Sequence, residues 1–462
     1  MLTEILPDDV LLQIFDFCVD QGQDTKEEVH AWQPLVRVCR QWRIIVFGSP
    51  RRLNLRLLCT PKRHAGTTLR IWPALPLLIQ GSIPSVSDAI NTIIMLNHSD
   101  RIHKIELDIS RSRLGHVLAA MQKPFPELTH LLLGASFDRY LDRTELVLPD
   151  LLLGGCAPRL QELTLHGIPF PELPRLLLSA THLVTLYLDK IPDFKMFSLD
   201  AMVIAVSALT RLEILCLEFE SSQSRAFSNV QGRCPPPPTR SILPVLTRFT
   251  FRGVSKVLEH LVARLNTPLL NTLSVTVFDE VLFDTPQLAR FISHLPRFSA
   301  NAEAEVLFTD GGVAIKLTSW TIGEGWSNVT IRTEMSISSL AHICTPPFPP
   351  LSTLEHLYID EFKDVDDDSD WEGYFEDTEL SELLRPFTAV KILYISKILA
   401  LRIVSCLRNL VDGGMTEVLP ALEDIFIEGL RQTGPAQECI GQFVAARQLS
   451  GHAITISLWD RD

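Results

Sequence analysis

"LQELTLHGIPFPELPRLLLSATHLVTLYL", residues 160–188, contains one short pattern twice, 23 residues apart. In LQELTL and LVTLYL an aliphatic residue is followed by two variable residues, an aliphatic, one variable residue and a further aliphatic. The alternation of apolar and variable residues at the end predicts a half-buried β-strand. A return segment lies between the copies. The stretch therefore predicts a repeating unit of one strand and one return.

Ten clear copies of this pattern follow one another along the chain. They begin at Ile102, Leu128, Leu160, Leu183, Leu212, Leu246, Leu270, Leu354, Val390 and Leu422. One interval, of 84 residues, is far longer than the rest, and weaker copies at 303–308 and 326–331 predict two degenerate repeats inside it. Poorer copies at 53–55, 77–79 and 454–456 extend the array over residues 51–462. Such a period predicts stacked units that bury their apolar sides against their neighbours.

Some return segments have the spacing of helices. Residues 85–97 place Val86, Ile90, Ile93 and Ile94 on one side, after serines suited to capping. Residues 286–295 and 438–449 give similar patterns. Other returns contain proline and are expected to be irregular for a few residues before a helix begins.

In its strand-and-return pattern the sequence resembles the leucine-rich-repeat proteins. The resemblance implies an α/β fold, an irregular solenoid shaped as a horseshoe. The position eight after the start of each repeat is commonly Asn or Cys in that family, and no Asn occupies it here. The residues found there are Ser110, Ser136, Ile168, Ile191, Glu220, Val254, Phe278, Phe362, Ile398 and Leu430. We therefore expect turns that depend on packing more than on side-chain hydrogen bonds.

Composition narrows the class of protein. The chain has 462 residues, 46% of them hydrophobic, with no run of 18 uncharged apolar residues and no basic start to "MLTEILPDDV", so we expect a soluble intracellular protein. Nine scattered cysteines without a CxxC pair indicate neither a disulfide framework nor a metal site. The net charge of −13 opposes binding to nucleic acid and to anionic membranes, and favours a basic or neutral protein partner.

Residues 1–50 do not follow the repeat and read as helices. Pro7 suits a first helical position, and Val10, Leu11, Ile14, Phe15 and Cys18 recur at helical spacing. A second helical stretch begins near Trp32 and continues through "LVRVCRQWRIIVF", residues 35–47. It has two apolar sides: Leu35, Val38, Cys39 and Trp42 on one, and Val36, Ile44, Ile45 and Phe47 elsewhere. We expect the first stripe to be buried and the second to require a partner.

Leu6-Pro7 at the start, followed some thirty residues later by Val38-Cys39-Arg40-Gln41-Trp42, resembles an F-box. The whole chain is similar to the large fungal group of F-box proteins with degenerate leucine-rich repeats. The resemblance implies docking on the Skp-type adaptor of SCF, a cullin-RING ubiquitin ligase. The matching positions are Leu6, Pro7, Val10, Leu11, Ile14, Leu35, Val38, Cys39 and Trp42.

This resemblance implies a substrate-recognition subunit located in the cytoplasm, the nucleus or both. Such a subunit catalyses no reaction and needs no cofactor; it holds a target protein near the conjugating enzyme. No nucleophile elbow, metalloprotease motif or nucleotide-binding loop occurs in the sequence, in agreement with a non-enzyme. The alternative is a leucine-rich-repeat scaffold without a ligase, whose N-terminal helices only cap the array.

The variable residue inside each strand should point to the concave face of the array. These residues are Glu106, Leu132, Thr164, Tyr187, Cys216, Thr250, Ser274, Tyr358, Tyr394 and Phe426. The last three should stack as an aromatic stripe, flanked by His356, Asp360, Asp424 and Glu428. Aromatic residues rimmed by charge are typical of protein-binding hot spots. The stripe is either a target-binding site or a surface covered by a C-terminal helix or loop.

Two insertions interrupt the repeats. Residues 361–379 are rich in acids and form either a solvated loop or an acidic collar for a basic target, with Trp371, Tyr374 and Phe375 as anchors. Their spacing resembles a calcium loop, but Ser369 replaces the required glycine, which argues against calcium. Residues 221–240 contain a proline run and form either a stiff connection or a docking segment for an aromatic groove.

Overall fold

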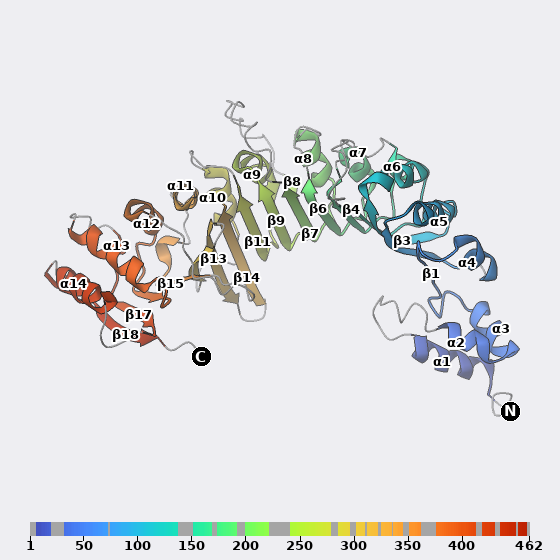
Figure 1. Cartoon of the computed structure of the whole chain (residues 1–462), viewed down its shortest axis with the longest axis horizontal. Helices are drawn as coiled ribbons and strands as arrows, with labels where there is room; N and C mark the ends of the chain where they lie inside the picture. Colours follow the sequence, from blue (N-terminus) through green and yellow to red (C-terminus); the bar gives the residue numbers. More distant parts are fainter. Residues whose placement is uncertain are drawn as a thin grey trace. The chain divides into compact units, whose positions relative to one another are not determined.

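The computed structural model describes residues 6–19, 32–72, 74–136, 151–168, 173–191, 199–220, 241–278, 285–295, 302–309, 312–321, 325–334, 336–344, 351–361, 376–412, 418–429, 435–449 and 451–459 (Figure 1). The chain forms two compact units, Met1–Leu212 and Glu213–Asp462, here called the first and the second unit. None of the described helices has the length and apolar content needed to cross a membrane.

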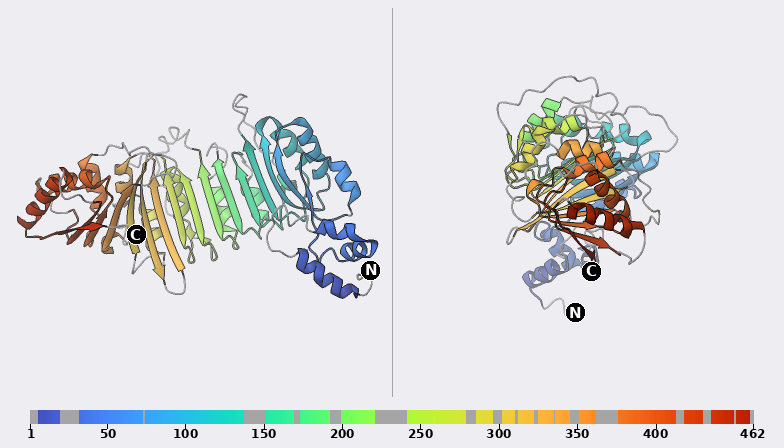
Figure 2. Two further views of the ribbon diagram at one scale, coloured as in Figure 1. Left: turned by 60° about the horizontal axis from the view of Figure 1, so that its bottom comes forward. Right: turned by 90° about the vertical axis from the view of Figure 1, so that its left-hand side faces the viewer.

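The first unit starts with three helices, here called the helical head, and continues as a parallel sheet. Its helices are α1 (Asp8–Val19), α2 (Trp32–Val38), α3 (Arg40–Gly48), α4 (Ala65–Ile71), α5 (Val86–Leu96), α6 (Arg111–Ala120), α7 (Leu173–Ser179) and α8 (Leu199–Ser207). Its strands are β1 (Leu57–Cys59), β2 (Leu77–Ile83), β3 (Ile102–Ser110), β4 (His130–Ser136), β5 (Glu162–His166) and β6 (Thr185–Ile191). They pair in chain order, all parallel. Figure 2 shows these strands as a row with the connecting helices on one side.

The second unit holds a longer, mixed sheet. Its strands are β7 (Ile214–Phe219), β9 (Arg248–Gly253), β11 (Thr272–Val277), β12 (Ala302–Thr309), β13 (Gly312–Thr321), β14 (Gly325–Thr333), β15 (His356–Glu361), β16 (Ile392–Ile395), β17 (Asp424–Glu428) and β18 (Thr455–Trp459). A separate two-stranded ladder pairs β8 (Ser241–Ile242) with β10 (Leu265–Asn266). The helices are α9 (Ser255–Val262), α10 (Pro286–Ser293), α11 (Ile337–Cys344), α12 (Asp377–Leu384), α13 (Ala400–Asp412) and α14 (Pro435–Leu449).

All ten clear copies of the repeat contain a strand, and the predicted alternation is present. In β11 and β17 every second residue is buried while the residues between are partly exposed. The repeating strand and helix make each unit a leucine-rich-repeat-like solenoid, as the sequence predicted; the horseshoe curvature stays a prediction. One poorer copy was wrong: residues 53–55 form a turn because Asn54 adopts a positive φ, although Leu53 and Leu55 are buried.

Backbone hydrogen bonds link successive repeats at the starts of the strands. The amide of Thr129 donates to the carbonyl of His103 at 2.9 Å, and the amide of Gln161 donates to the carbonyl of Thr129 at 2.8 Å. The same link recurs in the second unit, where the amide of Glu423 donates to the carbonyl of Lys391 at 2.8 Å. Each repeat is thus tied to its neighbour through the backbone, and at Thr129 the side-chain hydroxyl adds a second hydrogen bond to the His103 carbonyl.

The long interval between repeats is filled by a β-meander and not by the two degenerate repeats that the sequence predicted. Strands do occur at both predicted places, as β12 and β14, but β13 lies between them and is antiparallel to both. The order in space is reversed: β14 pairs with β11, and β12 pairs with β15. Short hairpin connections cause the reversal, because they bring consecutive strands back antiparallel without the long crossover that a parallel pair needs.

Helix α5 forms where it was predicted but buries the opposite side. Ser85 and Asp88 form a capping box at its start, and Ala89, Met95 and Leu96 are buried. Val86 and Ile90 are instead more than half exposed, at 52% and 54%. The buried side contains the small residues Ala89 and Thr92, which let the helix approach the strands closely; the hydroxyl of Thr92 is satisfied by the carbonyl of Asp88.

A carboxylate from one repeat caps the helix of the next. Helix α10 has no side-chain cap of its own, and the carboxylate of Glu259 on α9 accepts hydrogen bonds from the amides of Gln287 at 3.1 Å and Leu288 at 2.8 Å. Burial raises the pKa of Glu259 above its ordinary value, although these two hydrogen bonds act in the opposite direction. The site therefore needs an acceptor more than it needs a negative charge.

Replacing Glu259 separates the contribution of its hydrogen bonds to stability from that of its negative charge. Glu259→Ala should lower the free energy of unfolding by about 1–2 kcal/mol, since two helix-terminal amides lose their acceptor. Glu259→Gln should cost much less, because its carbonyl oxygen still accepts while the burial of a charge is removed. Urea unfolding of the three proteins measures both values. Equal losses in the two variants would show that the charge itself provides the stabilisation.

Candidate functional site

The helical head is held together by a small core with an aromatic centre. Leu11 and Phe15 of α1 are buried, and the ring of Phe15 lies 4.7 Å from that of Trp42 on α3. The side-chain amide of Gln41 also donates to the carboxylate of Asp8 at 3.1 Å. These contacts orient α1 against α3 and set which side of α1 points outward.

A break at Cys39 divides the second predicted helix into α2 and α3. Because of this break, the burial predicted for the two apolar stripes is wrong at several residues. Cys39 is extended and caps α3, its sulfur accepting a hydrogen bond from the amide of Trp42 at 3.5 Å. The break changes the phase of the helical pattern. Val36 and Ile45, expected to need a partner, are buried, whereas Val38, expected inside, is 57% exposed.

The nine residues that the F-box resemblance singled out fall into three groups by exposure. Leu11 is buried in the core of the head. Leu35, Cys39 and Trp42 are half-buried. The exposed group is Leu6, Pro7, Val10, Ile14 and Val38. Sequence reasoning missed one further exposed apolar side chain of the head, Phe17, whereas Ile44 is exposed as its place in the second stripe predicted. Phe17 lies seven residues after Val10, a spacing that places it on the same side of α1.

The head is anchored on the first repeat by Trp32. This residue is 1% exposed, and its indole nitrogen donates to the carbonyl of Arg56 at 2.9 Å. Its ring meets those of Phe47 and Trp72 edge-on, at 6.0 and 5.0 Å. Trp72 directly follows α4, so the contact joins the head to the start of the sheet.

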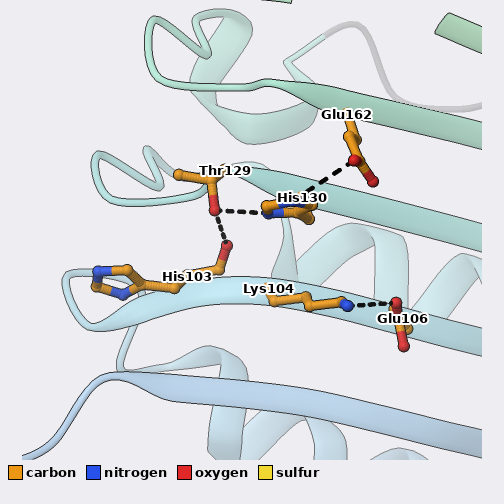
Figure 3. A network of polar contacts seen from close by, with 6 residues as sticks. All are labelled: His103, Lys104, Glu106, Thr129, His130 and Glu162. Atoms are coloured by element: carbon orange, nitrogen blue, oxygen red, sulfur yellow. Dashed lines mark hydrogen bonds and ion pairs between the residues drawn. The ribbon is translucent and has the colours of Figure 1, made fainter. Parts of the chain in front are cut away.

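Ionic and histidine side chains occupy the open face of the first unit, the face of the sheet that its connecting helices do not cover. Figure 3 shows Lys104 and Glu106 on β3, 2.9 Å apart, and the His130 Nε2 and Glu162 pair on β4 and β5, 3.7 Å apart. Thr129 donates its hydroxyl to the carbonyl of His103 and also contacts His130 Nδ1 at 2.8 Å.

These polar residues were not recognised from the sequence, apart from Glu106. His130 and Glu162 each lie two residues before the central variable residue of their strand, so the alternation of the strand could have placed them on this face. Among the described residues, no group of three or more His, Cys, Asp or Glu side chains is placed to hold a metal ion.

The predicted aromatic stripe is present on the open face of the second unit. Tyr358, Tyr394 and Phe426 occupy matching register positions on β15, β16 and β17. The two tyrosine rings stack 4.4 Å apart at 8°, and the rings of Tyr394 and Phe426 stack 5.1 Å apart at 20°. All three side chains are partly exposed. These three residues are called the aromatic ladder below.

The four predicted flanking residues do not all behave alike. His356 stacks over Tyr394 at 6.3 Å, and Asp424 and Glu428 are half-buried acceptors for Thr455 and the Lys397 amide. Asp360 differs from them, because it is only 5% exposed and accepts a hydrogen bond from the amide of Glu361. Burial of Asp360 therefore corrects its expected place on the rim.

A fourth aromatic residue, Trp459 on β18, belongs to this site and was missed from the sequence. Its indole lies 5.4 Å from Tyr394 and 6.1 Å from Tyr358, tilted by 58° and 52°. β18 pairs with β17, two strands away from Tyr394, so only the size of the indole brings the rings together. Trp459 partly covers the ladder, but it lies on a strand and is neither the C-terminal helix nor the loop that the sequence suggested as a cover. The acidic segment 362–375 and residues 221–240 lie outside the described residues.

The phenol of Tyr358 is partly buried and lies in a negative environment. Burial raises its pKa to about 12, and the nearby carboxylates of Glu303 and Glu305 on β12 and a hydrogen bond with Tyr394 act in the same direction. Glu305 lies directly beside Tyr358 in the register of the two strands. The ladder therefore carries negative potential at its β12 end.

Comparison with known proteins finds matches among solved structures. No family model and no curated protein matches the sequence. Among solved structures the chain is similar to the leucine-rich repeat-containing protein LegL7 from Legionella pneumophila, with 14% identity over 87% of this chain and 99% of that one, and a TM-score of 0.27. A likeness at this level adds nothing to the fold, which the register of the strands already shows.

Alkaline titration tests the environment of Tyr358. Because the pKa is raised above the ordinary value of 10 to about 12, the stability that depends on the neutral phenol is fully present below pH 10 and is lost as the pH rises through 12. Tyr358→Phe keeps the ring and should remove this loss, together with the late step in phenolate absorbance. Tyr394→Phe should move that step to lower pH. A single step near pH 10 in the unaltered protein would show that the pKa of Tyr358 is not raised.

Proposed function

We propose that this chain is the substrate-recognition subunit of an SCF-type cullin-RING ubiquitin ligase. The helical head docks a Skp-type adaptor, and the open face of the repeats binds the target protein. The chain itself forms and breaks no bonds. It contributes proximity, holding a target lysine near the charged conjugating enzyme so that their reaction becomes effectively intramolecular.

One observation carries the adaptor half of the proposal: the head exposes apolar side chains along α1. Leu6, Val10 and Ile14 follow one another at four-residue spacing and are 39%, 38% and 44% exposed, and Phe17 is 81% exposed. Val38 and Ile44 add 57% and 62% exposed side chains from the other two helices. Clustered apolar side chains on a small helical unit are typical of a protein-binding surface.

The alternative function, a repeat scaffold whose head is only a cap, is favoured by the anchoring of Trp32. Its buried contacts with Trp72 and the Arg56 carbonyl cover the start of the array, as a terminal cap must do. A cap needs an apolar inner side but gains nothing from exposed apolar residues on its outer side. The two functions therefore differ in whether Val10 and Ile14 contact a partner: they do so in a ligase subunit and do not in a simple cap.

Binding to a purified Skp-type adaptor distinguishes these functions. Val10→Asp combined with Ile14→Asp should weaken adaptor binding about 100-fold or more, since two apolar side chains can no longer be buried in the complex. Both residues are exposed in the free chain, so the fold should persist. Co-elution and titration calorimetry measure the change.

The matched control is Val86→Asp combined with Ile90→Asp on α5. It has the same chemistry, the same four-residue spacing and similar exposure, outside the head. The control should bind the adaptor as the unaltered chain does. If the unaltered chain shows no binding, or if both double variants lose it equally, the ligase proposal is wrong and the scaffold function stands.

A further inference from the structure

Charge is segregated along the open face of the second unit. On β12, β15, β16, β17 and β18 the open-face residues are Glu303, Glu305, Leu307, Thr309, His356, Tyr358, Asp360, Ile392, Tyr394, Asp424, Phe426, Glu428, Thr455, Ser457 and Trp459. Five of these described residues are carboxylic acids, of which Asp360 is buried, and none is lysine or arginine. This set is called the acidic-aromatic half.

The remaining strands of the same sheet carry more cations than carboxylic acids on their open face. On β7, β9, β11, β13 and β14, the described open-face residues include four cations, Arg248, Arg252, Lys316 and Arg332, and one carboxylic acid, Glu218. A second carboxylic acid, Glu334, directly follows β14 and pairs with Arg252 at 3.1 Å. Lys316 of β13 pairs with Glu305 of β12 at 3.0 Å where the two halves meet. The acidic-aromatic half is thus distinct in charge from its neighbour in the same sheet.

Within the acidic-aromatic half, Glu303 is the carboxylate most available to a ligand. It is exposed and forms no ion pair with any described residue. Its charge nevertheless reaches the ladder, because it contributes to the raised pKa of Tyr358. A cation beside Tyr358 would therefore meet both a carboxylate and an aromatic ring.

The aromatic residues of this half also favour a cation. Tyr358 and Tyr394 stack too closely, at 4.4 Å, to admit a side chain between them, so a ligand must bind at the outer face or the exposed edges of the stack. Trp459, tilted over both tyrosines, offers a further aromatic surface. Cations bind to the faces of such rings, and tryptophan is the strongest of them.

We propose that the acidic-aromatic half binds a basic segment of the target protein through arginine side chains. That this segment belongs to a ligase target rests on the function proposed above. The binding of arginine itself does not require a ligase. Arginine suits this surface better than lysine, because its planar guanidinium stacks on aromatic rings, is weakly hydrated and pairs with carboxylates. Glu303 supplies the carboxylate and the Tyr358, Tyr394 and Trp459 rings supply the aromatic surface.

Fluorescence anisotropy with labelled peptides tests this inference on the full chain. The probes are three eight-residue peptides in which glycine alternates with arginine, with lysine or with glutamate. At low salt the arginine peptide should bind the most tightly, the lysine peptide more weakly and the glutamate peptide not at all. Equal binding of the arginine and glutamate peptides, or no binding of the arginine peptide, would overturn the inference.

Two variants locate the binding site. Glu303→Gln and Tyr394→Leu should each weaken binding of the arginine peptide about fivefold or more, the first by removing charge and the second by removing a ring. The control Glu438→Gln removes an exposed carboxylate from α14 in the same unit and should change binding less than twofold. Glu303 is exposed, so its variant should fold normally. A control that weakens binding as much as Glu303→Gln would show that net charge, not this site, attracts the peptide.

The same preparations are assayed for adaptor binding, which keeps the two proposals separate. Arginine-peptide binding at this site without adaptor binding would refute the ligase function and support the inference. Adaptor binding without site-dependent peptide binding would overturn the inference and leave the ligase function standing.

Discussion

Parallel backbone register between successive repeats is the constraint on which the rest of the structure depends. A single repeat buries only one side of a strand and a helix, and its remaining apolar surface is covered by the next repeat. Hydrogen bonds such as that from the Gln161 amide to the Thr129 carbonyl keep neighbouring strands aligned. Since strands lie about 4.8 Å apart, equivalent residues in successive repeats become neighbours on the open face. A tyrosine or phenylalanine at one position of the repeat therefore becomes a stack.

The β-meander shows how an insertion is tolerated by such an array. β14 and β12 keep the parallel register with β11 and β15, so the sheet is not interrupted although the order of the strands is reversed. β13 is the only antiparallel strand among the described strands of this sheet, and it brings Lys316 against Glu305. That ion pair marks the boundary between the basic and the acidic-aromatic halves. The insertion thus changes the charge distribution of the face while conserving its backbone.

The helical head divides its apolar residues between an inner core and an outer surface. Its length allows only a small core, which Leu11, Phe15 and Val36 occupy, while Trp32 connects it to the first repeat. Val10, Ile14 and Phe17 remain exposed on α1. Exposed apolar side chains lower solubility, so a protein that retains them in a cluster is expected to cover them with a partner. The two ends of the proposed function, adaptor docking and target binding, are therefore on surfaces of different chemistry: one apolar and one acidic and aromatic.

The sequence by itself determined where the strands begin, which side of each strand is buried and that Tyr358, Tyr394 and Phe426 would stack, because these properties follow from a local period of two and a repeat spacing. It also located α1, α5 and α10. Only the tertiary structure decided the break at Cys39, the side of α5 that is buried, the reversed order of β12 to β14, the burial of Asp360 and the position of Trp459 over the ladder. Each of these depends on which distant residues compete for the same space. Apolar periodicity shows that a helix or strand has a buried side, but the phase of a helix and the order of strands are set by caps, short connections and packing partners that are remote in the chain.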